Sequence, residues 1–148
     1  MALTEHLRIR TAELPDDLPQ IHKIRYLVFQ IEQGVAPELE FDGKDDESSH
    51  LLALINQEAV ATVRLRPLNL ATIKLERFAV LQQFRGQGVG YHLMQYSLDW
   101  VRQNQITQVQ MNAQLAVQGF YEKFGFVAEG NVFEEAGIPH IRMKKLLR

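Results

Sequence analysis

Three glycines at alternate positions, Gly86, Gly88 and Gly90, follow Arg85 in the stretch VLQQFRGQGVGYHLMQ. Glycine is costly inside regular structure, so three of them at one junction need a reason. An apolar, strand-like run precedes them, and a helix-like pattern starts at Val89. Backbone N–H groups at a helix N-terminus bind anions, and glycine lets a phosphate approach that backbone closely. With the fixed charge of Arg85 at its rim, the stretch predicts a diphosphate site; a flexible strand-to-helix turn is the alternative interpretation.

Two other kinds of phosphate site do not fit this stretch. A P-loop needs Gly-Lys-Ser/Thr after its glycines, and this chain has Val89, Gly90 and Tyr91 there. A dinucleotide-binding fold needs its glycines after the first strand of a parallel βαβ unit. Here they follow several strand-like runs whose connections are too short for parallel crossovers.

Hydrophobic periodicity predicts the elements that position these residues. The predicted elements are a strand at 7–12, a helix at 18–31, a loop at 34–49, a hairpin at 50–67, a strand at 71–81, a helix from 89, a strand at 108–114, a short helix at 116–125 and two strands within 126–147. The order β-α-β-β-β-α-β-α-β-β, with strands grouped in the middle, indicates an α+β fold with a mixed sheet.

Length and composition indicate one globular domain, 1–148, with a core from about residue 7 onward. The chain has 148 residues, 46% of them hydrophobic, and a net charge of -2. We expect no nucleic-acid partner and no membrane partner, because there is no basic field and no apolar run near the roughly 18 residues that span a bilayer. Without a secretory signal at the N-terminus, a cytoplasmic location is expected. The absence of cysteine excludes thiolate nucleophiles, and no spacing of His, Asp and Glu predicts a metal site.

Two segments in the expected order resemble the signatures of a known family. The segment ERFAVLQQFRGQGVGYHLM is similar to the acyl-CoA-binding motif of the GCN5-related N-acetyltransferases (GNAT), in which Arg85, Gly88 and Gly90 fill a Gln/Arg-x-x-Gly-x-Gly/Ala pattern. The second signature is NAQLAVQGFYEKFGF. The segments RYLVFQIEQGVAPELEFDGKDD and FEEAGIPHIRM are similar to those of the ElaA-like group, so the resemblance covers about residues 7–148.

The resemblance implies a fold and a donor. It implies a GNAT fold, with a mixed, mostly antiparallel sheet of about six to seven strands flanked by helices and a splayed central pair that forms the acyl-CoA cleft. In family structures the strand at 77–80 bulges, and its backbone N–H groups bind the donor and the oxyanion. The residues implied to bind acetyl-CoA are Phe78, Ala79, Val80, Arg85, Gly86, Gln87, Gly88, Val89, Gly90, Tyr91, Gln114, Tyr121 and Phe124. Gln114 stands where many members have asparagine, and we expect a comparable amide contact.

The resemblance also implies a general acid, Tyr121, beside the CoA sulfur. Its ordinary pKa of about 10 lies near the thiol value of about 8.5, so full proton transfer costs only about 2 kcal/mol. The alternative interpretation is that Tyr121 is one of the aromatic core residues. Glu76 and His140 are the candidate bases that would take the proton of the amine. Each has a structural alternative, as a structural or solvent-facing charge for Glu76 and as a strand histidine held by local hydrogen bonds for His140.

The acceptor is an amine, in a small molecule or a peptide, whose identity the sequence leaves open. Glu32, Gln33 and His140 are predicted to border the acceptor pocket, by resemblance to the ElaA-like group. The acidic segment 38–47 either attracts a cationic amine or is a solvated loop. The expected activity is therefore acetyl transfer from acetyl-CoA to a primary amine. A non-catalytic acyl-CoA-binding or regulatory module, or a subunit that uses the fold for homodimer formation, is the alternative.

Overall fold

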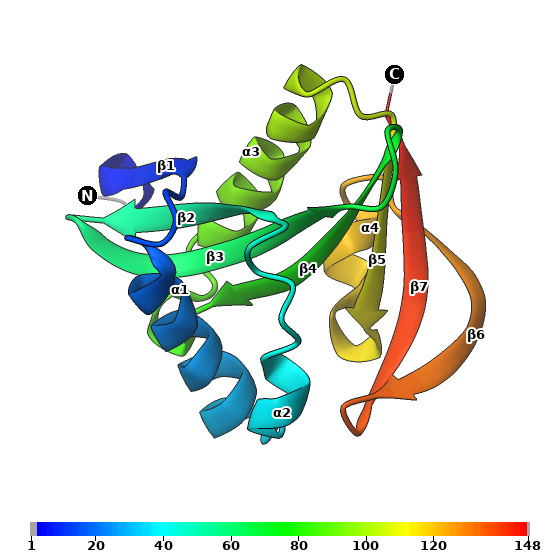
Figure 1. The fold of residues 1–148 in the computed structure, drawn as a ribbon, viewed down its shortest axis with the longest axis horizontal. Coiled ribbons are helices and arrows are strands. Elements are labelled where there is room, and N and C mark those ends of the chain that lie inside the picture. Colours follow the sequence, from blue (N-terminus) through cyan, green and yellow to red (C-terminus); the bar gives the residue numbers. More distant parts are fainter. Residues whose placement is uncertain (1–2, 148) are drawn as a thin grey trace.

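The computed structural model describes residues 3–147, and its centre is one seven-stranded mixed sheet (Figure 1). The strand order is β1-β2-β3-β4-β5-β7-β6, and every neighbouring pair is antiparallel except β4 and β5, which are parallel. The predicted α+β fold and its number of strands are confirmed. The strands are β1 (Leu7–Thr11), β2 (Ser49–Ile55), β3 (Glu58–Pro67), β4 (Thr72–Val80), β5 (Gln108–Gln114), β6 (Val127–Glu135) and β7 (Ile138–Leu146).

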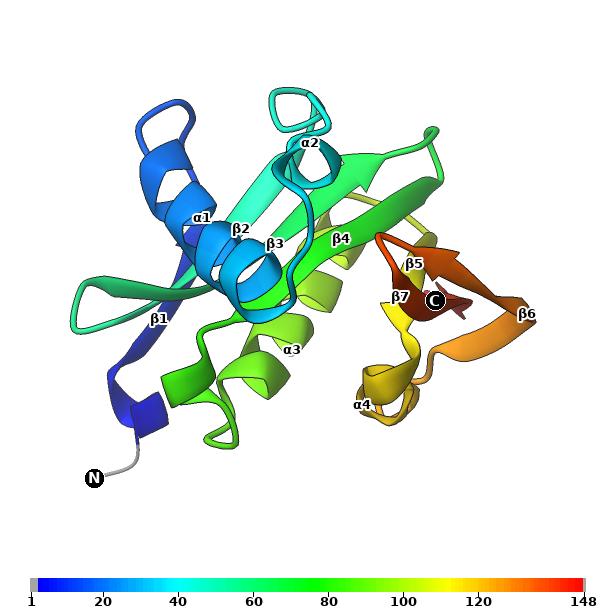
Figure 2. The same cartoon turned by 90° about the horizontal axis from the view of Figure 1, so that it is seen from below.

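Helices cover both faces of the sheet. Figure 2 shows α1 and α2 on one side of β2–β4 and α3 on the other. The helix predicted at 18–31 consists of α1 and a π-helical continuation, η2, in which the N–H of Gln33 donates to the carbonyl of Val28. The segment 34–49, predicted as a loop, contains the short α2. The helical elements are η1 (Leu3–His6), α1 (Leu18–Arg25), η2 (Tyr26–Glu32), α2 (Pro37–Glu40), η3 (Gln82–Phe84), α3 (Val89–Gln103), η4 (Leu115–Val117) and α4 (Gln118–Glu122).

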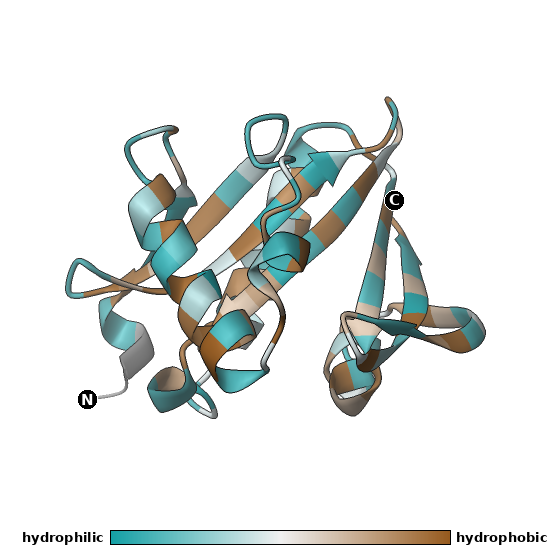
Figure 3. Ribbon diagram, turned by 60° about the horizontal axis from the view of Figure 1, so that its bottom comes forward, coloured by the Kyte–Doolittle hydropathy of each residue, from teal (hydrophilic) through white to brown (hydrophobic). Residues whose placement is uncertain are grey.

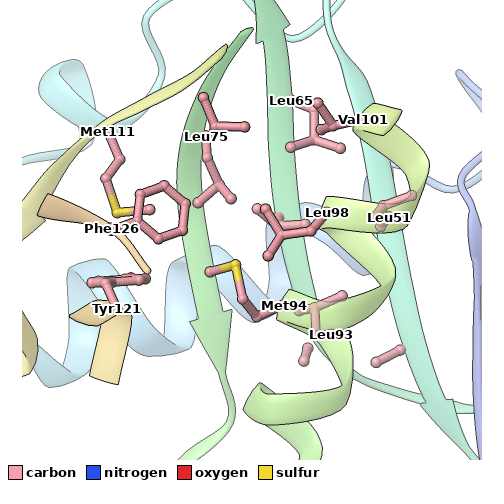
Figure 4. Close-up of a cluster of buried hydrophobic side chains, with 14 of the residues drawn as sticks. Leu51, Leu65, Leu75, Leu93, Met94, Leu98, Val101, Met111, Tyr121 and Phe126 are labelled. Atoms are coloured by element: carbon pink, nitrogen blue, oxygen red, sulfur yellow. The ribbon is translucent and has the colours of Figure 1, made fainter. Parts of the chain in front are cut away.

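The hydrophobic core forms one layer on each face of the sheet. Neighbouring residues of a strand point to opposite faces, so Leu51 joins the layer under α3 while Leu52 joins the layer under α1. Figure 3 shows hydrophobic residues in bands along the strands. Burying a leucine side chain stabilises a fold by about 2 kcal/mol. The two layers therefore hold the middle strands, including β4, in a fixed position. Residues that α3 contributes to its layer are Val89, Leu93, Met94, Leu98 and Val101. The last four are labelled in Figure 4.

The parallel pair β4 and β5 separates after three residues. Residues 72–74 of β4 pair with residues 108–110 of β5, and no further pair follows although both strands continue. β5 instead pairs with β7 along its whole length, from Gln108 to Gln114. The expected splayed central pair is thus confirmed. It leaves the β5-facing backbone of β4, from residue 75 to 80, without a strand partner.

A β-bulge lies within the unpaired part of β4. Thr62 of β3 pairs with Ala79, but Arg64 pairs with Glu76, so two residues of β4 oppose one residue of β3. Arg77 in this bulge has a φ of +54°, in the left-handed region that few residues other than glycine adopt. Bulges re-aim the backbone and leave polar groups free of the ladder. The bulge thus places free backbone groups of β4 in the same region where β4 and β5 separate.

Candidate active site

A cavity of about 770 Å³ opens where β4 and β5 separate. Its walls come from β4, the glycine loop, the end of β5, α4, and the turn between β6 and β7. It brings together most of the residues that the sequence predicts for a site. The predicted residues that line it are Gln33, Glu76, Phe78, Ala79, Val80, Arg85, Gly86, Gly88, Gly90, Tyr91, Gln114, Tyr121 and His140.

Four predicted residues lie outside the cavity lining. Val89 is buried in the core beneath α3, and Gln87 is exposed with its amide donating to the carbonyl of Gln83 at 3.2 Å. Phe124 packs behind the lining, with its ring centroid 5.3 Å from that of Phe120. Glu32 contacts Arg85. Of the four, Phe124 and Glu32 contact residues of the lining, Phe120 and Arg85.

The glycine loop leads directly into α3. Gly88 is the N-cap residue of this 15-residue helix and has a φ of +89°, and Gly86 has a φ of +75°. The first N–H groups of a helix have no partner within the helix. At Gly90 a Cβ atom would lie 3.7 Å from both Phe120 and Val80, which is an ordinary van der Waals distance, so this position borders the cavity wall without itself requiring glycine. The loop thus presents free donors and the positive end of the helix dipole to the cavity.

Arg85 is held at the rim of the cavity by two partners. Its Nε donates to the carbonyl of Val80 at 2.9 Å, and its two Nη atoms donate to the carboxylate of Glu32 at 2.5 and 2.7 Å. The hydrogen bond from Arg85 lowers the pKa of Glu32. Glu32, which the sequence predicts at the acceptor pocket, lies instead beside the arginine of the donor motif.

Gln33 and Gln114 link the two sides of the cavity. The side-chain amide of Gln114, at the end of β5, donates to the side-chain oxygen of Gln33 at 2.9 Å. The two residues are 81 positions apart in the chain. Both line the cavity, so an uncharged bridge lies between the end of η2 and the end of β5.

Tyr121 is the one titratable residue that α4 adds to the cavity lining. Its side chain is buried among Phe78, Phe120 and Phe126. Figure 4 shows it beside Phe126. Burial raises the pKa of Tyr121 further above neutral pH. The phenol therefore keeps its proton near neutral pH, and its O–H group is available as a hydrogen-bond donor.

His140 has a fixed tautomer. Its Nδ1 lies 2.7 Å from the carbonyl oxygen of Ile138, which only accepts hydrogen bonds, so Nδ1 carries the proton of the neutral ring. Nε2 then holds the free electron pair and lies 3.7 Å from Oε2 of Glu135. The ring also stacks on Phe133. A neutral imidazole with an open Nε2 and a carboxylate nearby can accept a proton.

Glu76 is held by three cations. It accepts from Arg64 at 2.8 Å and from Arg66 at 2.7 and 3.1 Å, and Lys74 lies 3.3 Å away. Burial alone raises its pKa, but the hydrogen bonds and charges of the two arginines outweigh burial and lower the pKa to about 2. So acidic a carboxylate is a poor base near pH 7. The arrangement favours the structural interpretation of Glu76.

Only part of the acidic segment is solvated: Glu38, Asp46 and Glu47 are exposed, whereas Glu40, Asp42 and Asp45 are held in ion pairs. Arg25 and Arg64, both fully buried, bind its carboxylates: Arg25 contacts Glu40 and Asp45, and Arg64 contacts Asp42 and Asp45. These ion pairs hold the segment against the sheet. Sequence reasoning missed both arginines. The sequence did contain a signal for them, because each arginine lies within an apolar run. An arginine that is buried with such a run needs a carboxylate partner.

Two absences apply to the described part of the chain. Among residues 3–147, no group of three His, Asp or Glu side chains is placed to hold a metal ion. No helix in the same range is long and apolar enough to cross a membrane.

A splayed mixed sheet, with a glycine loop opening a helix beside the cleft, defines the class of GNAT-fold acetyltransferases. The model of the acetyltransferase (GNAT) domain family matches residues 28–147. The chain belongs to this family.

The relatives and solved structures agree with this assignment. The chain is 32% identical to the uncharacterized protein YyaT of Bacillus subtilis (strain 168), covering 94% of this chain and 95% of YyaT. It is 34% identical to protein ElaA of Escherichia coli (strain K12), over 83% of each chain. The crystal structure of E. coli ElaA has a TM-score of 0.83 at 30% identity, covering 94% of this chain and 99% of that one.

Two further structures share the fold. That of an N-acetyltransferase described as putative, from Lactobacillus plantarum, has a TM-score of 0.89 at 26% identity, covering 96% of this chain and 99% of that one. A GNAT family acetyltransferase from Elizabethkingia anophelis, with acetyl-CoA bound, has a TM-score of 0.76 at 18% identity, covering 97% and 99%. Because the identity to the E. anophelis protein is only 18%, this similarity shows a shared fold and no more.

Proposed function

We propose that the protein transfers an acetyl group from acetyl-CoA to a primary amine by direct attack of the amine on the thioester. The observation that carries the proposal is the position of Tyr121. This buried, protonated phenol lines the same cavity as the free edge of β4 and the glycine loop. The cavity thus holds an acid, backbone donors and an anion site together. The sequence contains no cysteine, which favours direct attack over a covalent thioester on the enzyme.

The donor half of the proposal rests on the glycine loop and β4. The free N–H groups at the start of α3 suit the diphosphate of CoA, and Arg85 adds a positive charge. The unpaired backbone at 75–80 offers hydrogen bonds to the pantetheine arm, as a partner strand would. The distant fold neighbour from E. anophelis binds acetyl-CoA, which supports the same donor here.

The reaction must remove a proton from the amine, stabilise the oxyanion and supply a proton to the departing thiolate. A lysine-like amine has a pKa of about 10.4, so removing its proton near pH 7 costs about 4.6 kcal/mol. We assign this proton to Nε2 of His140, with the carboxylate of Glu135 stabilising the imidazolium that forms. The amine nitrogen then bonds to the thioester carbon, and the oxygen of that carbon becomes an oxyanion. Backbone N–H groups of the bulged segment 77–80 are its proposed donors.

Collapse of the oxyanion breaks the carbon–sulfur bond. The electron pair of that bond leaves on sulfur, and Tyr121 donates its proton to the thiolate. The nitrogen then loses its second proton, which restores the phenol of Tyr121, and His140 releases the first proton to solvent; the products are the N-acetyl amine and CoA. Glu76 takes no part in this sequence and keeps the charges of β3 and β4 in place.

An acetyl-transfer screen tests the proposal. The protein is incubated with acetyl-CoA and a broad library of primary amines, and released CoA is measured against a reaction without amine. Amine-dependent release supports the proposal. Tight acetyl-CoA binding with no transfer to any amine identifies a non-catalytic module instead. Failure to bind acetyl-CoA at high micromolar concentration removes both functions.

A further inference from the structure

One face of the paired strands β3 and β4 carries an unbalanced group of charges. Arg64 and Arg66 of β3 and Lys74 and Glu76 of β4 alternate along their strands and lie on the same face. Arg66 pairs directly with Lys74 in the register. Two like charges directly opposite each other destabilise a sheet unless anions lie between them. This face therefore needs more negative charge than Glu76 alone supplies.

The neighbouring carboxylates do not remove the imbalance. Arg64 has further partners in Asp42 and Asp45. Arg66 and Lys74, in contrast, contact no carboxylate but Glu76 within residues 3–147. Apart from His22, which contacts Asp45, the ion-pair network consists of five cations and four carboxylates: Arg25, Arg64, Arg66, Lys74 and Arg77 against Glu40, Asp42, Asp45 and Glu76.

The unbalanced cations face the cavity. Arg66 and Lys74 line it, with 14% and 25% of their side chains exposed, and Lys44 lines it as well. The Nη1 group of Arg66 has no hydrogen-bond partner among the described residues, and Lys74 has a single contact for its three N–H donors. A guanidinium edge beside an ammonium group suits a carboxylate.

This positive end lies away from the proposed chemistry. Lys74 pairs with Gln110 of β5, and His140 pairs with Gln114, four residues further along that strand. Four residues of a strand span about 13 Å. At the His140 end the charge is reversed, because Glu135 lies there with Asn112 donating to it at 3.2 Å. The cavity lining is thus negative near the proposed base, while at its far end the cations Lys44, Arg66, Lys74 and Arg77 outnumber the carboxylates Glu40, Asp42 and Glu76.

We propose that the acceptor is a small primary amine that carries a carboxylate several bonds away from its nitrogen. The inference rests on the proposed function and names the substrate class of the same site. The amine lies beside His140 and Glu135, and the carboxylate lies on Lys74 and Arg66. An α-amino acid is too short for both ends, since its nitrogen and carboxylate share one carbon neighbour.

Matched pairs of acceptors test the proposal. 4-Aminobutyrate and 6-aminohexanoate are each compared with their own carboxamides, which keep the amine and the length but lose the charge. We expect kcat/KM to be about tenfold higher for at least one acid than for its amide. Equal values for acid and amide in both pairs overturn the inference. No transfer to any amine overturns the proposed function, so the two failures are distinct.

Variants at Lys74 locate the effect. Lys74→Met is expected to lower kcat/KM for the preferred acid about tenfold, through KM, while the value for its amide stays within about twofold. Lys74→Glu is expected to reverse the preference. Lys123→Met, an exposed lysine outside the cavity lining, is the matched control and should change neither value. Equal losses for acid and amide in Lys74→Met overturn the assignment of the carboxylate to this end.

Discussion

Arg85 and Glu32 form a bidentate ion pair that joins the glycine loop to the end of η2, with N···O distances of 2.5 and 2.7 Å. The arginine of the donor motif therefore already has an anionic partner before any phosphate arrives. The third contact of Arg85, from Nε to the carbonyl of Val80, does not involve Glu32. The hydrogen bond to Val80 therefore still orients Arg85 when the carboxylate of Glu32 is removed.

Glu32→Gln is expected to strengthen CoA binding about two- to fivefold, because it removes a negative charge beside the diphosphate while Val80 still orients Arg85. Isothermal titration with CoA measures the change. The gain should shrink as salt is added, because screening weakens the repulsion in the wild type. Weaker binding by the variant would instead mean that Glu32 is needed to position Arg85.

Gly88→Ala is expected to weaken CoA binding about tenfold and to lower the free energy of unfolding by about 1 kcal/mol, because residue 88 has a φ of +89° at the start of α3. Titration and thermal unfolding measure the two effects. Gly130→Ala is the matched control, since Gly130 has a φ of +79° on the far strand β6. It should cost similar stability and leave CoA binding unchanged; normal binding by Gly88→Ala would contradict the role given to the loop.

Tyr121→Phe is expected to lower kcat about 100-fold while the Kd of acetyl-CoA stays nearly unchanged, because the variant keeps the ring in the core and loses only the proton donor. Steady-state kinetics and titration give the two values. Tyr96→Phe, on the exposed surface of α3, serves as the control. A Tyr121→Phe enzyme with full turnover would remove this residue from the mechanism.

His140→Gln is expected to lower kcat/KM about 100-fold at pH 7, because glutamine cannot take the proton of the amine. The deficit should narrow as the pH rises toward about 10, where a lysine-like amine loses its proton without help. A pH profile of both enzymes is the measurement. A loss that stays constant over this range would point to a structural role for His140.

Glu76→Gln is expected to lower the free energy of unfolding at pH 7 by about 3 kcal/mol. The folded protein holds the pKa of Glu76 at about 2, below its ordinary 4.5, so the carboxylate stabilises the fold above about pH 4.5. That contribution disappears as the pH falls toward 2. Urea unfolding of both proteins at several pH values should show the difference narrowing from pH 4.5 downward. A difference that does not depend on pH would contradict the assigned charge of Glu76.

The glycine loop before α3 was predictable because it depends on residue types within one short segment. The left-handed backbone at Gly86 and Gly88 favours glycine, so these two positions are visible in the sequence. The fold was predictable for a similar reason, since strand and helix periodicities are local. The π-helical turn of η2 was not, because it keeps the apolar spacing of an ordinary helix.

The contacts that organise the rest of the site join segments far apart in the chain. Glu32 and Arg85 are 53 positions apart, and Gln33 and Gln114 are 81 apart. One sequence contains no signal for such pairs. The sequence therefore indicated that Glu32 is important but placed it at the acceptor side. Glu76 was a candidate base on its own, and only the structure adds the arginines that make it a weak one.

The three-residue ladder between β4 and β5 makes the sheet two half-sheets joined at one end. Beyond residues 72–74 no main-chain bond ties β4 to β5, and the halves meet through side chains such as Gln33 and Gln114. A joint of this kind can change its opening angle without breaking any ladder. The cleft between β4 and β5 can then hold bound molecules of different thickness. The separation of these two strands is therefore an adjustable dimension of the fold.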